Sequence, residues 1–465
     1  MAKNQLGFWV LTAFVVGNMV GSGILLLPRT LAEVASPAGI LSAWILTGFG
    51  VLMLALVFGN LSLRKPELSG GPQIYAKALP RQGSNRSIFV GYLVSWGYWI
   101  SNWSGNVAII TTFASYLSTF FPIMTSNAPL WQIGGFTLRV GNVITFFVCS
   151  ALLWAVHYLI LRGIEGAGKV NLIATASKVV GFIFFIIISL FVFQASNMVP
   201  FAVPVPGDGG QNVGLLGQVN HAAVATLWAF VGIESAVVFS SRARKKSDVK
   251  KATSFGLLLT LVIYMGITVL VLGTLTRDQL LSSQKPLVDA LAVSVGDSGA
   301  YIMAVLALIS LTGTTIGWVL LSAEVPYQAA KQGIFPKKFM SENKDGAPVF
   351  ALVLSNGLAQ IFLFSTISQS MAHAFTFVIL IATLTYLAPY LVSALYQLKL
   401  VFTKETYEGQ PKARVFDGVV AVLATVYSVW VIKAGTSDLQ TFFLGLGLFA
   451  LGIVFYPLVP KPGKL

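Results

Sequence analysis

Long apolar segments, each followed by a short polar connection, dominate the chain. A helix that crosses a membrane needs about 20 mostly apolar residues, and twelve segments of this kind are present. They cover residues 8–27, 38–60, 88–121, 141–161, 171–194, 219–240, 254–275, 298–323, 348–367, 371–396, 415–433 and 438–458. This pattern predicts an all-α, polytopic membrane protein with about twelve transmembrane helices. No small-residue cleavage site follows the first segment, so we expect it to be retained.

Composition narrows the class of protein further. Of the 465 residues, 56% are hydrophobic and 10% are charged, whereas soluble domains carry about 25% charged residues. With a mean hydropathy of +0.80, the chain has too much apolar surface for a cytosolic enzyme, a disordered chain or a secreted disulfide-rich domain. Cys149 is the single cysteine, which excludes an intrachain disulfide.

The distribution of charge indicates orientation. The net charge is +14, which in a soluble protein would suggest nucleic acid as a partner. If the N-terminus lies inside, 24 of the 30 Lys and Arg residues fall on inner segments and five on outer ones. Such a bias is typical of cytoplasmic loops. We therefore predict cytoplasmic termini, a location in the plasma or bacterial inner membrane, and no binding of nucleic acid.

Motifs for catalysis or ATP hydrolysis are absent: the sequence has no P-loop, HExxH, CxxC or GxSxG. The loops are too short for a soluble domain, and we expect the scattered His157, His221 and His373 to form local hydrogen bonds. Twelve spans without an energy domain predict a secondary transporter that uses no cofactor or metal and is not an enzyme.

The first span carries small residues at its centre, namely Gly17, Gly21, Ser22 and Gly23, with Pro28 beyond them. Transporters often bind substrate between half-helices near mid-membrane. A break at Gly21–Gly23 would expose backbone N–H groups, and the N-terminus of the outer half-helix would favour a carboxylate. The alternative is a packing face, because Gly17 and Gly21 are four residues apart.

The sixth span has the same feature, a glycine at mid-span (Gly232), followed by Glu234. Spans one and six are corresponding members of two five-helix halves, as an inverted repeat requires. We infer this symmetry without a residue-level repeat and expect a first repeat at 1–200, a second at 201–400, and helices 11 and 12 at 401–465.

Polar and aromatic residues mark further spans. In the third span Tyr98, Asn102 and Asn106 share one helical face and either line a cavity or bond a neighbouring helix. Small residues beside Trp318 in the eighth span form either a gate or close packing. The tenth span offers Thr383, Thr385, Tyr386 and Tyr390.

Glu234 and Lys178 are the two charges well inside the predicted spans. A carboxylate is costly to bury in lipid, so Glu234 is a candidate functional residue. Lys178 either takes part in proton coupling or is a structural cation held by backbone carbonyls. We favour the structural role, because a buried ion needs compensating partners.

The sequence resembles transporters of the amino acid/polyamine/organocation superfamily, in particular bacterial basic amino-acid/polyamine antiporters. The stretches that carry the resemblance are Gly17–Gly23 with Pro28, Arg64–Gly71 leading to Tyr75 and Ala76, Tyr98–Asn106, and Thr226–Ala236. The run Leu153–Ile164 looks like arginine/ornithine antiporters. The resemblance covers nearly the whole chain and implies a leucine-transporter-type fold of 5+5 inverted repeats, with helices 1 and 6 discontinuous and two extra helices.

The resemblance also implies roles for matching residues. Gly21, Ser22 and Gly23 would hold the substrate carboxylate. Carbonyls of an unwound stretch from Trp228 through Ala229 and Phe230 to Gly232 would hold the α-amino group. Trp228 would cover the substrate and Trp318 would contact its side chain, while Tyr98, Asn102 and Asn106 line the site, with Tyr98 near a gate. Glu234 matches a proton-sensing glutamate, and Lys178 matches a lysine that stands where sodium sits in related transporters.

One position departs from the family pattern. Arginine/agmatine antiporters have serines in the tenth span that help to hold the guanidinium group, and this chain has Ile379 and Leu380 near those places. We therefore expect an antiporter that exchanges arginine, lysine or ornithine for a related amino acid or amine. Membrane lipid surrounds such a protein, and the expected assembly is a homodimer. The alternatives are a proton-coupled symporter or permease of broader specificity and, less favoured, an amino-acid sensor that does not transport.

Overall fold

Each of the twelve predicted segments coincides with a helix or with two consecutive helices. The computed structural model describes residues 5–80, 84–133, 136–206, 212–283, 285–364, 369–435 and 439–460. Its α-helices are α1 (Phe8–Met19), α2 (Ser22–Val34), α3 (Pro37–Arg64), α4 (Pro72–Ala78), α5 (Asn85–Leu117), α6 (Val140–Leu161), α7 (Ile164–Leu190), α8 (Leu215–Phe230), α9 (Ser235–Val238), α10 (Lys246–Thr274), α11 (Arg277–Ser282), α12 (Pro286–Val295), α13 (Asp297–Lys331), α14 (Val349–Leu363), α15 (Gln369–Thr403), α16 (Pro411–Gly435) and α17 (Leu439–Phe455).

Six of the described helices are long and apolar enough to cross a membrane by themselves: α3, α6, α7, α10, α13 and α16. The bent pair formed by α8 and Ser235–Arg242 adds a seventh span. The helices α1 and α14 are apolar but shorter, and α5 has many Trp, Tyr, Ser and Asn residues that lower its hydropathy. The protein is therefore a multi-pass membrane protein, while the count of twelve spans stays a prediction.

Several short elements lie in the connections and were not predicted. The helices α4, α11 and α12 lie in loops, and the strands β1 (Pro129–Ile133) and β2 (Phe136–Arg139) form an antiparallel hairpin. A second, two-residue pair joins β3 (Val205–Pro206) to β4 (Asn212–Val213). Short 3-10 turns cover Pro122–Thr125, Ala195–Met198, Phe239–Arg242, Lys337–Met340 and Tyr456–Leu458.

Local sequence explains where several helices begin. Ser36 caps α3 by accepting a hydrogen bond from the Gly39 N–H, and Pro37 occupies the first turn, where its missing N–H costs nothing. Ser84 caps α5 in the same way. Thr276 and Gln279 form a capping box at α11. These caps satisfy N–H groups that a helix start leaves unpaired.

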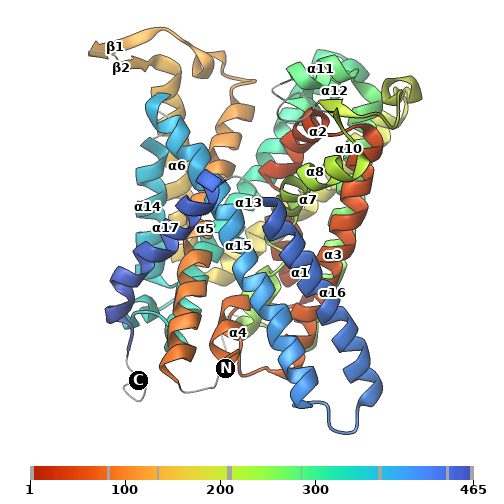
Figure 1. The fold of residues 1–465 in the computed structure, drawn as a ribbon. Coiled ribbons are helices and arrows are strands. Elements are labelled where there is room, and N and C mark those ends of the chain that lie inside the picture. Colours follow the sequence, from red (N-terminus) through yellow and green to blue (C-terminus); the bar gives the residue numbers. More distant parts are fainter. Residues whose placement is uncertain are drawn as a thin grey trace.

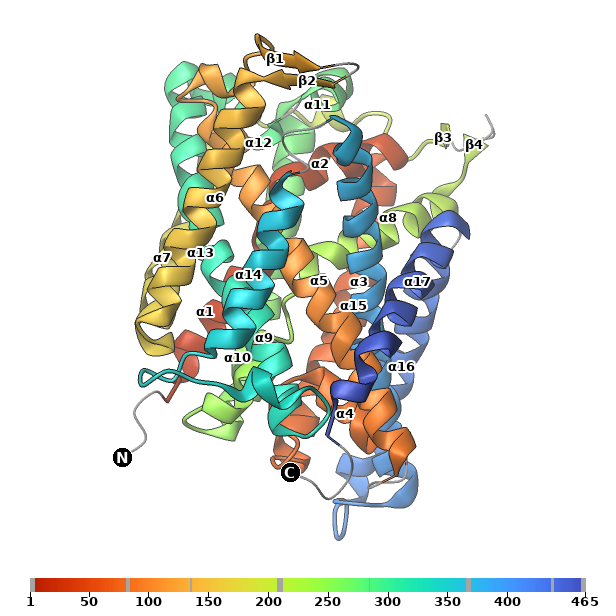
Figure 2. The same ribbon diagram turned by 90° about the vertical axis from the view of Figure 1, so that its left-hand side faces the viewer.

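The helices form a bundle with both chain termini at the same end (Figure 1). The β1–β2 hairpin, α11 and α12 lie at the opposite end (Figures 1 and 2). At the centre of the bundle, α1 packs against α7, α10 and α13, and α5 packs against α13 and α15. The helix α17 lies at the edge against α5 and α15 (Figure 2). Also in the interior, α1 contacts α9 and α2 contacts α8, so the first two helices pack against both parts of the bent pair.

Candidate functional site

The first span is broken between α1 and α2, at Val20 and Gly21. A Cβ atom added at Gly21 would lie 2.7 Å from Thr314 Cγ2 of α13, so this position tolerates no side chain without movement of its neighbour. Gly17 is equally tight, because a Cβ atom added there would lie 2.7 Å from Thr175 Oγ1 of α7. Both alternatives considered for these small residues therefore hold: they lie at or near a helix break, and they pack closely against neighbouring helices. Ser22 begins α2, and its side chain lies outside the described part of the structure.

Lys178 reaches this break from α7. Its Nζ atom donates hydrogen bonds to the carbonyl oxygens of Gly17 (2.9 Å) and Val20 (2.5 Å) and to Thr314 Oγ1 (2.7 Å). The side chain is fully enclosed, with 1% of its surface exposed. A cation in this position is attracted to the negative end of the α1 dipole. The contacts are those that a structural cation requires.

The second break separates α8 from α9 at Val231–Glu234, and the two parts of the span differ in direction by 43°. Gly232 has φ +106°, and a Cβ atom there would lie 2.8 Å from Asn18 Cβ of α1. The predicted unwound stretch began too early, because Trp228, Ala229 and Phe230 still belong to α8. The helix continues to the last residue before the turn that Gly232 permits, and only then does the chain change direction.

One tyrosine links the two breaks. The Tyr264 hydroxyl of α10 lies 2.6 Å from the Met19 carbonyl oxygen and 2.8 Å from that of Ala229. These carbonyls belong to the last turns of α1 and α8, where no intrahelical donor is left for them. A second link runs from Asn18 Nδ2 to Ser235 Oγ, at 2.7 Å. The ends of the two broken helices are therefore tied to each other directly.

Glu234 is fully buried at the second break. The Tyr98 hydroxyl of α5 donates to Oε1 at 2.7 Å, and the Tyr390 hydroxyl of α15 donates to Oε2. The Gly232 N–H also donates to Oε2, at 3.1 Å. Three donors from separate segments thus surround one carboxylate. The sequence offered Tyr390 only as one polar residue of the tenth span, because pairing with Glu234 depends on the tertiary arrangement.

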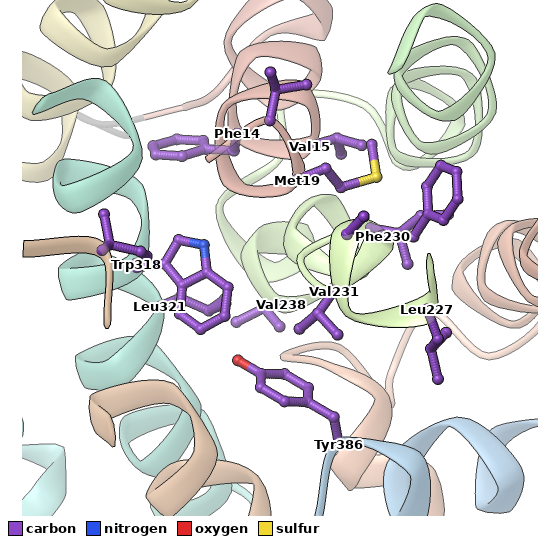
Figure 3. Packing of buried hydrophobic residues seen from close by; sticks show 14 of the residues in the cluster. Phe14, Val15, Met19, Leu227, Phe230, Val231, Val238, Trp318, Leu321 and Tyr386 are labelled. Carbon is purple, nitrogen blue, oxygen red and sulfur yellow. The ribbon is translucent and has the colours of Figure 1, made fainter. Parts of the chain in front are cut away.

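Aromatic rings lie on the side of the breaks that faces α5 and α15. Trp318 Nε1 donates to the Asn18 carbonyl oxygen (2.9 Å), and its ring centroid is 5.9 Å from that of Trp228 and also from that of Tyr386. Figure 3 shows Trp318 between the end of α1 and Tyr386. The three rings form a cluster beside the two breaks.

The polar face of the third span has two kinds of residue. The Tyr98 hydroxyl donates to Glu234, and Asn102 Oδ1 accepts from the Tyr386 hydroxyl at 2.8 Å. Both side chains therefore bond a neighbouring segment, which was one of the two alternatives for this face. Asn106 is buried, and neither atom of its amide has a hydrogen-bond partner among the described residues. A buried amide without a partner is uncommon in native structures. Asn106 is thus the member of this face with unused hydrogen-bonding capacity.

A small cavity lies where the breaks and the rings meet. Its volume is about 10 Å³, which is roughly the space one water molecule needs. The residues that line it are Asn18, Met19, Gly21, Gly23, Ile109, Trp228, Val231, Thr314 and Trp318. An amino acid does not fit in this volume, so the space between the two breaks is closed in this structure.

The end of the bundle that holds the termini is closed by an ionic cluster. Arg242 donates to both carboxylate oxygens of Glu324, at 2.8 and 3.0 Å. Glu324 is fully buried and also accepts from Gln328 Nε2 at 2.6 Å. The backbone of Leu6 pairs with that of Arg242 and Arg244, both at 2.8 Å. These bonds connect the segment before α1, the end of the second broken span, and α13.

Glu324 corrects one sequence-based expectation, that Glu234 and Lys178 are the two charges well inside the spans. The predicted eighth span ends at residue 323, but α13 continues to Lys331, and the ion pair with Arg242 allows the carboxylate to be buried there. Nearby Glu342 is within 4 Å of both Arg242 and Lys331. Partial burial raises the pKa of the Glu342 carboxyl above its ordinary value.

The remaining candidates are the three histidines and the two apolar residues of the tenth span. His157 Nδ1 lies 3.0 Å from Asn356 Nδ2, the kind of local bond expected, while His221 is exposed. The side chains of His373, Ile379 and Leu380 lie outside the described part of the structure. Within the described residues, no group of three His, Cys, Asp or Glu side chains is placed to bind a metal ion.

Comparison with known proteins identifies relatives along the whole chain. The family model for amino acid permeases matches residues 6–456. A Bacillus subtilis protein provisionally named an arginine/ornithine antiporter is 54% identical over 97% of this chain and 96% of its own length. The arginine/ornithine antiporter of Pseudomonas aeruginosa is 38% identical over 98% and 91%. The arginine/agmatine antiporter of Chlamydia trachomatis is 35% identical over 97% and 89%.

Proposed function

The chain belongs to the amino acid permease family, and from this premise we propose that it is a secondary active antiporter that exchanges arginine, lysine or ornithine for a related amino acid or amine. The observation that carries the proposal is the pair of helix breaks that meet at a closed cavity beneath Trp228 and Trp318. Its relatives are named as antiporters of arginine with ornithine or agmatine. Exchange proceeds by alternating access, with the breaks exposed to one side of the membrane at a time.

The two breaks present opposite ends of helix dipoles, which suits a zwitterion. The N-terminus of α2, at Gly21, Ser22 and Gly23, offers N–H groups and positive potential to the substrate carboxylate. The last turn of α8, at Trp228, Ala229 and Phe230, ends in carbonyls that each accept one hydrogen bond, from the Val231 N–H, the Tyr264 hydroxyl and the Ile233 N–H, and each keeps a second lone pair. These carbonyls would accept from the α-amino group.

Aromatic rings would receive the cationic side chain of the substrate. Trp228, Trp318 and Tyr386 lie next to the cavity, and each can hold a cation over its face. Asn106, with its unbonded amide, would add a polar contact. Because Glu234 already accepts three hydrogen bonds, it suits a role in closing the site better than a role as direct partner of the substrate.

Opening toward the termini would separate two layers of contacts. The layer near the site joins Glu234 to Tyr98 and Tyr390, and the outer layer joins Arg242 to Glu324. We assign this end to the cytoplasm on the strength of the loop charges. Within this scheme the chain divides into repeats at 1–200 and 201–400, with 401–465 forming two additional helices, and a homodimer remains a prediction.

Transport by purified protein in liposomes tests the proposal. Vesicles preloaded with ornithine should take up labelled arginine or lysine, whereas empty vesicles should take up little. Equal uptake by empty and loaded vesicles without a gradient would rule out obligatory exchange. Uptake into empty vesicles that requires an inward proton gradient would instead establish the alternative, a proton-coupled symporter.

A further inference from the structure

A polar pocket opens at the end of the bundle that holds the termini, away from the site described above. It lies where the C-terminal end of α3 and the N-terminal ends of α10 and α16 come together, and its volume is about 770 Å³. Three basic side chains line it, Arg64, Lys250 and Lys412, together with one carboxylate, Asp417. The lining therefore has a net positive charge.

The single carboxylate is fully engaged by the protein. Asp417 is 5% exposed and accepts from Asn60 Nδ2 (2.8 Å), Arg64 Nε (2.9 Å) and the Tyr407 hydroxyl (2.9 Å). Because its oxygens face these donors, Asp417 neutralises Arg64 but leaves the two lysines uncompensated. The pocket thus keeps two cations for a ligand.

Lys250 is held in position. Its Nζ atom donates to Asn60 Oδ1 at 2.9 Å, and the same Asn60 amide donates to Asp417. The stem of Lys250 packs on Gly59, where an added Cβ atom would lie 2.6 Å from Lys250 Cγ. An ammonium group has three donors, so the bond to Asn60 leaves capacity for an anion in the pocket.

The pocket is bordered by apolar side chains as well as by cations. Leu63 and Phe416 line it and are 43% and 58% exposed. In a multi-pass membrane protein such side chains contact lipid, and basic pockets between helices on the cytoplasmic side bind anionic head groups. A soluble phosphate would use the lysines but not this apolar border.

We propose that this pocket binds the phosphate head group of an anionic phospholipid, with Lys250 and Lys412 as its cationic ligands and Leu63 and Phe416 against its acyl chains. Arg64 and Asp417 form the wall that positions Lys250. The site is separate from the substrate cavity and goes beyond the exchange function proposed above.

Native mass spectrometry of the purified full-length protein tests this site. Short-chain phosphatidylglycerol should be retained in preference to phosphatidylcholine, and K250Q with K412Q should weaken retention by about fivefold per lysine. The matched control removes Lys245 and Lys251, which are exposed, lie at the same end and do not line the pocket. The control pair should retain the lipid like the unchanged protein.

Two outcomes would overturn the proposal. One is equal loss of phosphatidylglycerol in the pocket and control pairs, which would indicate general attraction to a basic surface. The other is full competition by glycerol 3-phosphate at the same concentration, which would identify a soluble phosphate as the ligand. Both variants should still bind substrate, which separates a failure of this proposal from a failure to fold.

Discussion

The two helix breaks bury charges of opposite sign. At the first break the Lys178 ammonium satisfies carbonyls at the end of α1, and at the second the Glu234 carboxylate accepts from the Gly232 N–H. An interrupted helix leaves carbonyls on one side and N–H groups on the other, so each break contains the charge that its own free groups require.

The partners of the two charges also differ. Lys178 is bonded to the main-chain carbonyls of Gly17 and Val20 and to the hydroxyl group of Thr314. Glu234 is bonded to the side-chain hydroxyl groups of Tyr98 and Tyr390, which come from two other helices, α5 and α15. We infer that the first break keeps its shape through the transport cycle, whereas the contacts of the second break form and open.

Removing the cation of the first break should have the largest effect. Lys178→Met leaves the Gly17 and Val20 carbonyls without a charged donor, and the loss of these bonds should lower the free energy of unfolding by about 3 kcal/mol. Thermal unfolding in detergent measures this change, and exchange activity should be lost with it. The control is Lys169→Met on the same helix, whose side chain is 68% exposed. Equal stability of the two variants would contradict the structural role of Lys178.

Removing the charge of the second break should alter regulation more than folding. We infer that Glu234, by accepting from both tyrosines when it is ionised, holds the terminal end closed, so protonation should favour opening and exchange should rise as the pH falls. Glu234→Gln does not ionise and should give a flat pH profile between pH 5 and 8. Its rate of exchange at neutral pH should change by about tenfold, because the substitution alters hydrogen bonds to a charged group.

Exchange assays across this pH range check the expectation for Glu234. Glu165→Gln is the matched control, since that carboxylate is 45% exposed and lies in a surface ion pair with Lys169, away from the contacts of Glu234. A pH profile of Glu234→Gln that matches that of the unchanged protein would remove Glu234 from the closing mechanism.

The aromatic side of the site should affect affinity rather than pH dependence. Trp318→Ala removes one cation-binding face and the bond to the Asn18 carbonyl, and we expect arginine affinity to fall about fivefold, the loss of roughly 1 kcal/mol. Calorimetric titration measures it. Trp318→Phe should recover part of the affinity, and Trp9→Ala, at an exposed position in α1, should have no effect. Unchanged affinity in Trp318→Ala would assign this ring to packing.

The link between the breaks should have the smallest effect. Tyr264→Phe removes one hydroxyl that approaches the Met19 and Ala229 carbonyls, and stability should fall by about 1 kcal/mol. Combining this change with Glu234→Gln tests coupling between the breaks. If the losses of stability in Tyr264→Phe and in Glu234→Gln add up to that of the double variant, Tyr264 does not couple the two breaks.

The sequence predicted the helices and both interruptions because these follow from local composition: long apolar runs, and glycines at mid-span. The family resemblance, rather than the local sequence, implied an unwound stretch that began at Trp228, whereas α8 continues to Phe230 and the break lies at Val231–Glu234. The sequence did not indicate the bonds of Glu234 with Tyr390 and of Glu324 with Arg242, because each joins residues far apart in the chain. Short elements such as the β1–β2 hairpin were not predicted, because their sequences, like those of loops in general, have only a weak periodic signal.

Because the Lys178 ammonium is tethered to α7, its effective concentration at the first break is set by the side chain and not by the surrounding solution. A dissociable ion would leave the carbonyls of α1 whenever its concentration fell. The tethered group stays with the Gly17 and Val20 carbonyls at any ionic composition, so exchange should proceed equally in sodium and potassium media. The same tether would leave no sodium gradient to act at this position.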